Sequence, residues 1–242
     1  MAMKIDAVAK AIVNPQPTGT KPAELSISES MKAQENALDQ GSENLQDAIS
    51  LGQTAEGALN SVVDNLQQIR ELTIQSQNGT YTDSDREIIQ DQVNQLLTGI
   101  DESLRNTEFN TIKLFDGGFD GNIQGGGEGQ GRTMTITQTS LDSLGLNEFD
   151  ITNPESLDAL DKALTKVNDT RGEIGSQTNA FESAIRSNEV ARENTLSART
   201  QFDEDLATQI TELKRLQITQ QYQFQLQNKE SETEKGKLDL LS

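Results

Sequence analysis

The chain has 242 residues, of which 33% are hydrophobic, and it contains neither cysteine nor histidine. Its formal charge at pH 7 is −19, which repels nucleic acid and anionic lipid, so we expect no nucleic-acid and no membrane partner. Without thiols and imidazoles, the sequence excludes disulfides, cysteine nucleophiles, Ser-His-Asp catalysis and the usual zinc sites. We therefore predict no catalytic residues, no metal site, no cofactor and no enzymatic activity.

The N-terminal segment, residues 1–22, is predicted to form a short helix around Ile5–Val13 followed by a linker. Pro15, Pro17 and Pro22 lie in this segment, and proline restricts its own backbone and that of the preceding residue. The segment lacks the apolar run of a cleaved secretion signal, and no stretch of the sequence is apolar enough to span a bilayer. We expect any export of the protein to use a route without such a signal.

A long helix is predicted from about Pro22 to the helix-ending pair Asn78-Gly79. Its apolar residues repeat at alternating spacings of three and four, which is typical of a coiled-coil seam. Gln34, Gly41 and Gly52 interrupt this seam and make it narrow. The seam residues are Met31, Leu38, Leu45, Ala48, Ala55, Leu59, Val62, Leu66 and Ile69.

A second helix is predicted to begin at residues 82–85, with Ser84 and Glu87 as a capping box. The short turn between the two helices favours an antiparallel hairpin. The apolar stripe of the second helix is predicted to comprise Ile89, Val93, Leu96, Ile100 and Leu104.

Residues 115–153 are predicted to hold one or two small β-hairpins, because Thr133–Thr139 alternates polar and apolar side chains between turn residues. The glycine cluster Gly125–Gly131 lacks the lysine and the following helix that a phosphate-binding loop needs. We interpret this cluster as a flexible turn.

The last helix is predicted to run from Asn153-Pro154 almost to the end of the chain, with Asn188, Arg192, Thr195 and Arg199 marking a weak or hinge-like zone. Some 60–70 helical residues would reach roughly 100 Å. The predicted fold class is therefore mainly α, an elongated antiparallel helical bundle or coiled coil with a small β-hairpin region. The apolar positions of this helix are Leu157, Leu160, Leu164, Val167, Ile174, Phe181, Ile185, Phe202, Leu206, Leu213 and Leu216.

The C-terminal part of this helix is rich in apolar residues that need a partner helix from the same chain, a neighbouring subunit or a chaperone. An ordinary intramolecular coiled coil explains the same periodicity, so both interpretations stay open. The residues predicted to pack in this way are Leu206, Ile210, Leu213, Leu216, Tyr222, Phe224 and Leu226.

Several motifs, in order along the chain, resemble those of bacterial flagellins. Together they cover most of residues 23–114 and, more loosely, 155–242. They are AELSISESMKAQ at 23–34, QTAEGAL at 53–59, LQQIREL at 66–72, NTEFNTIKLFDG at 106–117, DEDLA at 203–207 and the double leucine at 240–241.

The resemblance implies a structural subunit of the extracellular flagellar filament that serves motility and self-associates. It also implies a flagellin export chaperone, the flagellar type III export apparatus and, as further candidates, hook-associated proteins as partners. By this resemblance, residues 1–22 form a reduced inner domain, 23–114 an N-terminal helical shaft, 115–153 a β-hairpin region, 154–200 a C-terminal shaft helix and 201–242 an inner-domain helix.

The resemblance extends to the helix by which an innate immune receptor recognises flagellins. Arg70, Glu71 and Leu72 match that helix, but Gln68 replaces a receptor-contacting arginine and Gly99 replaces a contacting glutamate. Because the loss of such contacts weakens an interface, we predict weak receptor recognition.

Two departures from the family pattern keep alternatives open. The segment before residue 23 is short and broken by proline, and residues 229–235 are unusually charged. Both features argue against an ordinary inner coiled coil, and the short N-terminal segment favours a minor or regulatory flagellin. A hook–filament junction protein is a second alternative.

Overall fold

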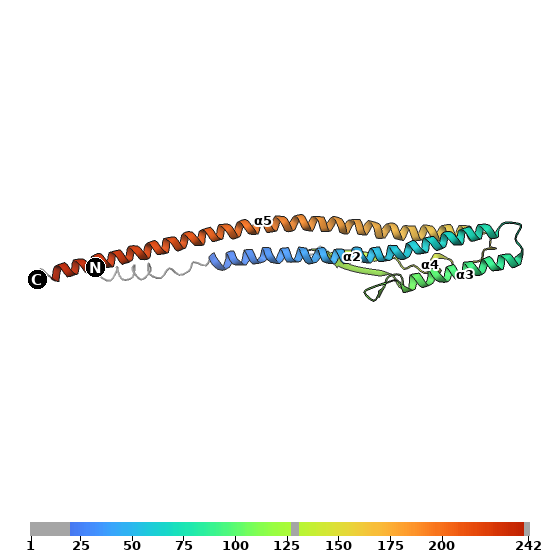
Figure 1. The fold of residues 1–242 in the computed structure, drawn as a ribbon, viewed down its shortest axis with the longest axis horizontal. Helices are drawn as coiled ribbons and strands as arrows, with labels where there is room; N and C mark the ends of the chain where they lie inside the picture. The colour runs from blue at the N-terminus through green and yellow to red at the C-terminus, as the bar shows by residue number, and fades with distance from the viewer. Residues whose placement is uncertain (1–19, 127–130, 240–242) are drawn as a thin grey trace. The chain divides into compact units, whose positions relative to one another are not determined.

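The computed structural model describes residues 20–126 and 131–239 and is dominated by long helices (Figure 1). The predicted fold class, mainly α with a small β-hairpin region, is confirmed, whereas the helix expected around residues 5–13 lies outside the described residues. The helices are α2 (Thr20–Ser76), α3 (Asp83–Asn106), α4 (Leu141–Leu144) and α5 (Ser156–Asp239), and the strands are β1 (Glu108–Phe109), β2 (Ile112–Lys113), β3 (Phe119–Gln124) and β4 (Gly131–Ile136).

The chain divides into two compact units. One comprises residues 37–191, and the other comprises 1–36 together with 192–242. Helices α2 and α5 contribute to both, and the division falls on α5 inside the zone that the sequence marked as weak or hinge-like. The two units are described separately below.

In the unit of residues 37–191, helices α2, α3 and α5 pack around one apolar core (Figure 1). Polar contacts show that α2 and α5 are antiparallel: Ser42 near the start of this part of α2 meets Asn188, and Arg70 near its end meets Asp161. The predicted α2 seam is buried from Leu38 to Ile69. The core is therefore a narrow helical seam, as the periodicity predicts.

The buried stripe of α3 differs from the prediction at one position. Leu97 is buried and Leu96 is only partly covered, while Ile89, Val93, Ile100 and Leu104 are buried as predicted. The stripe steps by four residues twice before stepping by three, whereas the prediction placed the step of three one turn too early. Both spacings keep residues on one helix face, so the sequence pattern alone did not separate these two neighbouring leucines.

Helix α3 begins within the predicted residues 82–85, but its capping pair differs from the prediction. The capping box is formed by Thr82 and Asp85, not by Ser84 and Glu87. The Asp85 amide donates to Thr82 Oγ1 at 3.3 Å, and the Thr82 amide donates to Asp85 Oδ2 at 2.9 Å. Thr82 has the extended backbone of a cap residue, and an aspartate three positions later accepts the reciprocal bond that the prediction assigned to a glutamate.

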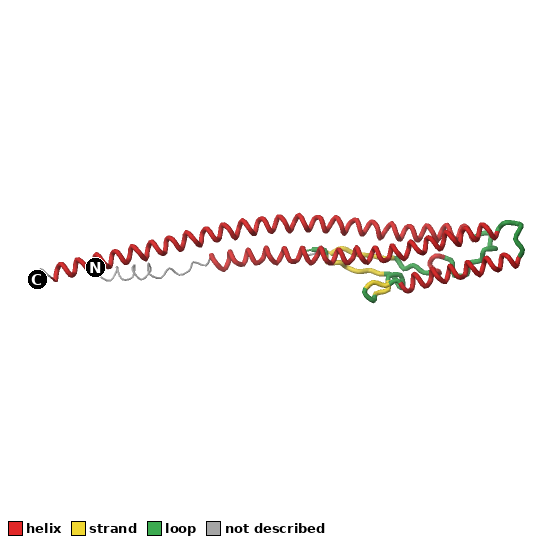
Figure 2. Tube along the Cα trace, viewed as in Figure 1, coloured by secondary structure: helices red, strands yellow, loops and turns green. Residues whose placement is uncertain are grey.

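The hairpin β3–β4 lies against α2 and explains why glycines interrupt the α2 seam (Figure 2). A Cβ atom added at Gly41 would lie 2.4 Å from the Gly126 backbone nitrogen, and one at Gly52 would lie 3.0 Å from Thr178 Oγ1 of α5 and 3.2 Å from Met134 Cε of β4. Met134 and Ile136 of β4 are buried. The missing side chain at Gly41 thus makes room for the hairpin, and the one at Gly52 makes room for both the hairpin and α5.

Polar side chains of α2 and α5 hold the hairpin in place. Gln177 of α5 accepts a hydrogen bond from the Thr135 amide at 2.7 Å and donates one to the Thr135 carbonyl at 3.0 Å. On the other strand, Asn44 of α2 donates to the Gln124 carbonyl at 2.9 Å. Backbone groups of both strands that β3–β4 pairing leaves outside the ladder are therefore satisfied by helix side chains.

Asn188, the first residue of the zone predicted to be weak or hinge-like, is itself well packed and hydrogen-bonded. Its side chain is buried and donates to the Gly125 carbonyl at 2.6 Å and to Ser42 Oγ at 3.2 Å. The polar residue interrupts the apolar stripe because it satisfies a buried carbonyl at the end of β3.

The hairpin β1–β2 was not anticipated, because the predicted β region began only at residue 115. Glu108 pairs with Lys113 in the register of the hairpin, and their side chains form an ion pair of 2.8 Å. Asn110 and Thr111 make the turn with positive φ values of 48° and 68°. Two consecutive residues with positive φ are typical of a type I′ turn. Asn is common in such turns but Thr is not, so the sequence Asn110-Thr111 only weakly predicts the turn.

Candidate functional site

The C-terminal part of α5 carries large apolar side chains that are exposed in the described structure. Leu213, Ile218 and Tyr222 keep 52%, 67% and 62% of their surfaces exposed. Leu216, Phe224 and Leu226 are exposed as well, whereas Leu206 and Ile210 are half-buried. We call this set, residues 206–226, the apolar end of α5.

The apolar end is hydrophobic on two sides. At 3.6 residues per turn, Phe224 falls on the same face as Leu206, Ile210 and Leu213, and the set Ile218, Tyr222 and Leu226 falls on the opposite face. A helix that is apolar on both faces is typical of one that becomes buried on several sides. The predicted narrow seam is therefore too simple a description of this segment.

Two polar contacts join α2 and α5 in the unit of residues 1–36 and 192–242. Arg199 donates to Glu35 Oε2 at 2.8 Å, and Ser28 donates to Asp203 Oδ1 at 2.8 Å. The Glu35 side chain retains only 12% of its exposed surface. Removal of either partner of such a poorly exposed ion pair would leave an uncompensated charge, so the pair couples the two helices.

The residues matched to the receptor-recognition helix do not share one exposed surface. Arg70 is half-exposed and forms an ion pair with Asp161 at 3.1 Å, and Glu71 is exposed. Leu72 is partly buried and packs against the core. A receptor approaching this helix would therefore meet an arginine that already has an acidic partner.

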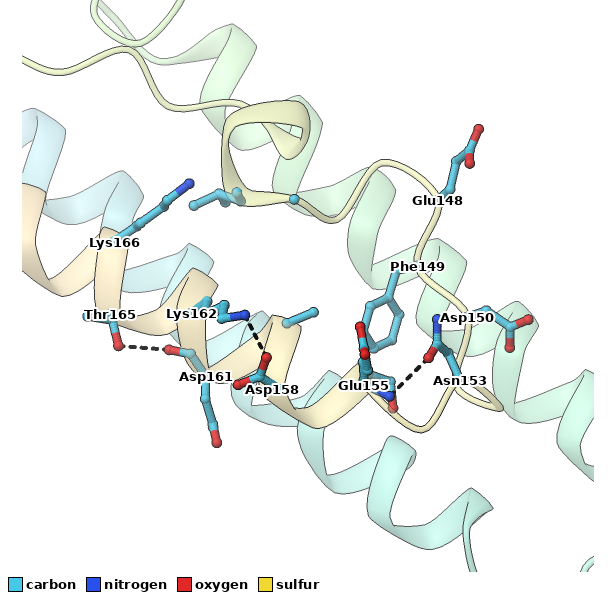
Figure 3. Close-up of a pocket in the computed structure, with 14 residues that line it drawn as sticks. Glu148, Phe149, Asp150, Asn153, Glu155, Asp158, Asp161, Lys162, Thr165 and Lys166 are labelled. Atoms are coloured by element: carbon cyan, nitrogen blue, oxygen red, sulfur yellow. Dashed lines mark hydrogen bonds and ion pairs between the residues drawn. The ribbon is translucent and has the colours of Figure 1, made fainter.

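A cavity of about 640 Å³ lies between the loop before α5 and the first turns of that helix (Figure 3). Both lysines of its lining are engaged: Lys162 forms an ion pair with Asp158 at 2.7 Å, and Lys166 donates to the Ser143 backbone carbonyl. The Asp158 carboxylate raises the pKa of Lys162. Within residues 20–126 and 131–239, no cluster of three or more acidic side chains is arranged to hold a metal ion.

Two aspartates have lowered pKa values, and both lie in local turns. Hydrogen bonds from the Thr82 side chain and amide lower the pKa of Asp85, and bonds from the Thr152 side chain and amide lower that of Asp150. Each carboxylate accepts bonds from a residue two or three positions away. Such shifts are explained by capping and turn formation, so they do not indicate a catalytic group.

The fold and its surfaces thus define a helical bundle protein whose most distinctive surface is an exposed apolar helix end. No helix in the described part of the chain is long and apolar enough to cross a membrane. Two family models match the chain: the bacterial flagellin N-terminal helical region at residues 17–120, and the bacterial flagellin C-terminal helical region at residues 157–234.

Curated relatives give the same result over most of the chain. A flagellin of Halalkalibacterium halodurans is 37% identical over 212 residues, covering 84% of this chain and 78% of the relative. A 30.7 kDa core protein of the flagellar filament of Treponema maltophilum is 34% identical over 219 residues, covering 81% and 77%. The crystal structure of Bacillus cereus flagellin aligns with a TM-score of 0.53 at 27% identity, covering 60% of this chain and 88% of that one.

The chain belongs to the bacterial flagellin family, and it is a structural subunit of the flagellar filament.

Proposed function

We propose that the subunit joins copies of itself in an extracellular filament through the apolar end of α5. The observation that carries this proposal is the pair of opposite apolar faces at residues 206–226. Burying one exposed leucine contributes about 1.5–3 kcal/mol, so several such residues favour association strongly. Two faces can accept neighbouring helices on both sides, which suits a filament better than a simple dimer.

The predicted organisation assigns a role to each segment. Residues 23–114 and 154–200 form the helical shaft of the subunit, and residues 1–22 and 201–242 form its reduced inner domain. The β-hairpin region at 115–153 stands where larger flagellins carry outer domains. The packing of α2, α3 and α5 around one core supports the shaft assignment.

The same exposed surface supports a need for partners before assembly. A subunit with uncovered apolar groups associates with unintended surfaces unless another protein covers them. We infer that a flagellin export chaperone binds the apolar end, and that the flagellar type III apparatus exports the chain. Hook-associated proteins are further candidates for contact at the filament base, and the subunit works without catalysis.

Seeded polymerisation tests the assembly surface. Purified parent protein is added to filament seeds and compared with a variant carrying Leu213→Ser and Phe224→Ser, two exposed residues on one face of α5. Because the variant lacks one leucine and one phenylalanine side chain that assembly would bury, we expect its elongation rate to fall at least about tenfold. Light scattering and electron microscopy measure the outcome.

A matched control separates lost apolar surface from lost helix propensity. Gln217→Ser and Gln220→Ser place the same two serines on the same exposed helix without removing apolar side chains. Circular dichroism checks that both variants keep their helix content. Equal elongation by the parent and the Leu213→Ser, Phe224→Ser variant would rule out this surface.

Electron microscopy also addresses the alternatives. A subunit with the proposed role extends micrometre-long filaments from seeds, whereas a junction protein is found at one end and a regulatory flagellin stays monomeric. The comparisons favour neither alternative over the filament subunit.

A further inference from the structure

The turn between α2 and α3 contains the single Asn-Gly pair of the sequence, Asn78-Gly79. Both residues are exposed, and the turn has no regular secondary structure between Ser76 and Asp83. An asparagine side chain followed by glycine is the arrangement in which the next backbone nitrogen reaches the side-chain carbonyl carbon with least obstruction, because glycine has no Cβ.

Hydrogen bonds to the Asn78 side chain make its carbonyl carbon, Cγ, more electrophilic. Its Oδ1 atom accepts hydrogen bonds from the Thr80 amide and from Thr80 Oγ1, both at 3.1 Å. This is the turn in which an asparagine bonds the backbone two residues further on. Two donors on one carbonyl oxygen draw electron density from Cγ and stabilise negative charge on that oxygen during attack.

The amide of Gly79 is the one backbone nitrogen of this turn that is left for such an attack. The amides of Gln77, Asn78 and Tyr81 donate to backbone carbonyls, and that of Thr80 donates to the Asn78 side chain. In the described part of the chain, no acceptor takes the Gly79 amide. A Cβ atom added at Gly79 would meet no atom within 4 Å outside its two chain neighbours, so no other segment crowds the Cβ side of this residue.

We propose that Asn78-Gly79 is a site of spontaneous covalent modification, in which Asn78 is converted to aspartate and isoaspartate through a succinimide. The Gly79 nitrogen loses its proton to solvent base and bonds to Asn78 Cγ, and the side-chain nitrogen leaves as ammonia. Water then opens the five-membered ring at either carbonyl. No oxidant, metal or enzyme is required.

The surroundings can accommodate the negative charge of an aspartate at position 78, but not the longer backbone of an isoaspartate there. A carboxylate here lies near the negative end of the α2 dipole, but Arg86 donates to the Ser76 carbonyl at 2.9 Å and lies beside the turn. The aspartate product keeps both bonds from Thr80. In contrast, isoaspartate inserts a backbone carbon into the turn closed by the Tyr81 amide and the Asn78 carbonyl, now 3.2 Å apart, and breaks that closure.

The chain contains its own comparison site, Asn60-Ser61. Asn60 is exposed like Asn78, and its next residue is small, but both lie inside α2. There the Ser61 amide is engaged in the helical ladder and its backbone is fixed. If exposure alone set the deamidation rate, the two asparagines would react at similar rates. The proposed geometry instead predicts that Asn78 reacts faster than Asn60.

Peptide mapping by mass spectrometry measures the reaction in the full-length protein, incubated in mildly alkaline buffer. We expect Asn78 to deamidate at least about tenfold faster than Asn60, which corresponds to a barrier about 1.4 kcal/mol lower. Labelling by an isoaspartate-specific methyltransferase should mark the same peptide. Deamidation of Asn60 at a similar rate, or an unmodified Asn78, would overturn the proposal.

A substitution at Gly79 provides the second test. Gly79→Ala places a methyl group in open space, so the fold is retained, but it hinders approach of the nitrogen to Asn78 Cγ. We expect the rate at Asn78 to fall by about tenfold or more. The control is Gly57→Ala, at an exposed glycine of α2 that also has open space, which should leave the rate unchanged. An unchanged rate in Gly79→Ala would refute the mechanism.

Discussion

Asn188 is a polar residue in the apolar stripe of α5, and its amide group satisfies the buried Gly125 carbonyl at the end of β3. Removing the side chain in Asn188→Ala leaves that carbonyl without its donor and opens a small cavity. We expect a loss of about 1–3 kcal/mol in the free energy of unfolding, measured by urea denaturation. Asn188→Asp should cost at least as much, because it presents a second acceptor to the carbonyl.

The control for this prediction lies on the same helix. Asn179 is exposed, so Asn179→Ala changes the same residue type without removing a buried hydrogen bond. It should change the free energy of unfolding by no more than about 0.5 kcal/mol. If Asn188→Ala were no more destabilising than Asn179→Ala, the hydrogen bond from Asn188 to the hairpin would not contribute to stability.

At the scale of elements, two glycines of α2 have different surroundings. Substitution by alanine should therefore have opposite effects on stability at the two positions. A methyl group at Gly41 meets the backbone of Gly125 and Gly126, which cannot move aside as a side-chain end can. Gly41→Ala should therefore destabilise the protein by about 1–3 kcal/mol. At Gly57 the space is open, and Gly57→Ala should stabilise the helix by about 0.5–1 kcal/mol.

Thermal unfolding followed by circular dichroism compares these two variants directly. Because both substitutions raise helix propensity equally, the difference between them isolates the close approach of the hairpin to α2. Equal shifts in the unfolding temperature would mean that the hairpin does not depend on the gap at Gly41.

The helices could be predicted from the sequence because their apolar side chains repeat at spacings that only a helix brings onto one face. The α2 seam and the extent of α5 follow from that repeat. The roles of Gly41 and Asn188 could not be predicted, because both depend on a hairpin some 80 and 60 residues away in sequence. The β1–β2 turn was missed for a local reason: Thr111 adopts a positive φ that its β-branched side chain disfavours.

The candidate site was partly visible in the sequence. The apolar residues between Leu206 and Leu226 were identified as requiring a partner, and most of them are exposed. The predicted set holds residues of two opposite faces, with Phe224 on one and Tyr222 on the other, but the prediction treated them as a single packing surface. The receptor residues came from a resemblance of motifs, and periodicity gave no sign that Arg70 pairs with Asp161 on α5.

At the scale of the whole molecule, recognition by an innate immune receptor depends on how the shaft meets another protein. We predict weak activation, because Gln68 stands where an arginine contacts the receptor in typical flagellins. The Gln68 side chain is exposed, so Gln68→Arg can be introduced without disturbing the core. Restoring a central arginine contact should raise potency in a cell reporter assay by about tenfold or more.

The control for Gln68→Arg is a variant that carries the same added positive charge at a neighbouring position. Gln67→Arg adds an arginine to the adjacent exposed position and should have little effect. Potency of the parent equal to that of a typical flagellin would contradict the prediction of weak recognition.

The bonds between Gln177 and Thr135 have a consequence for a subunit that joins many copies of itself. An open strand edge is a template on which another chain can add a strand, and such additions lead to aggregation. The Gln177 side-chain amide occupies the outward N–H and C=O of Thr135, near the C-terminal end of β4. At this position the strand edge is therefore closed to a strand from another chain, which favours contacts between copies through their helices.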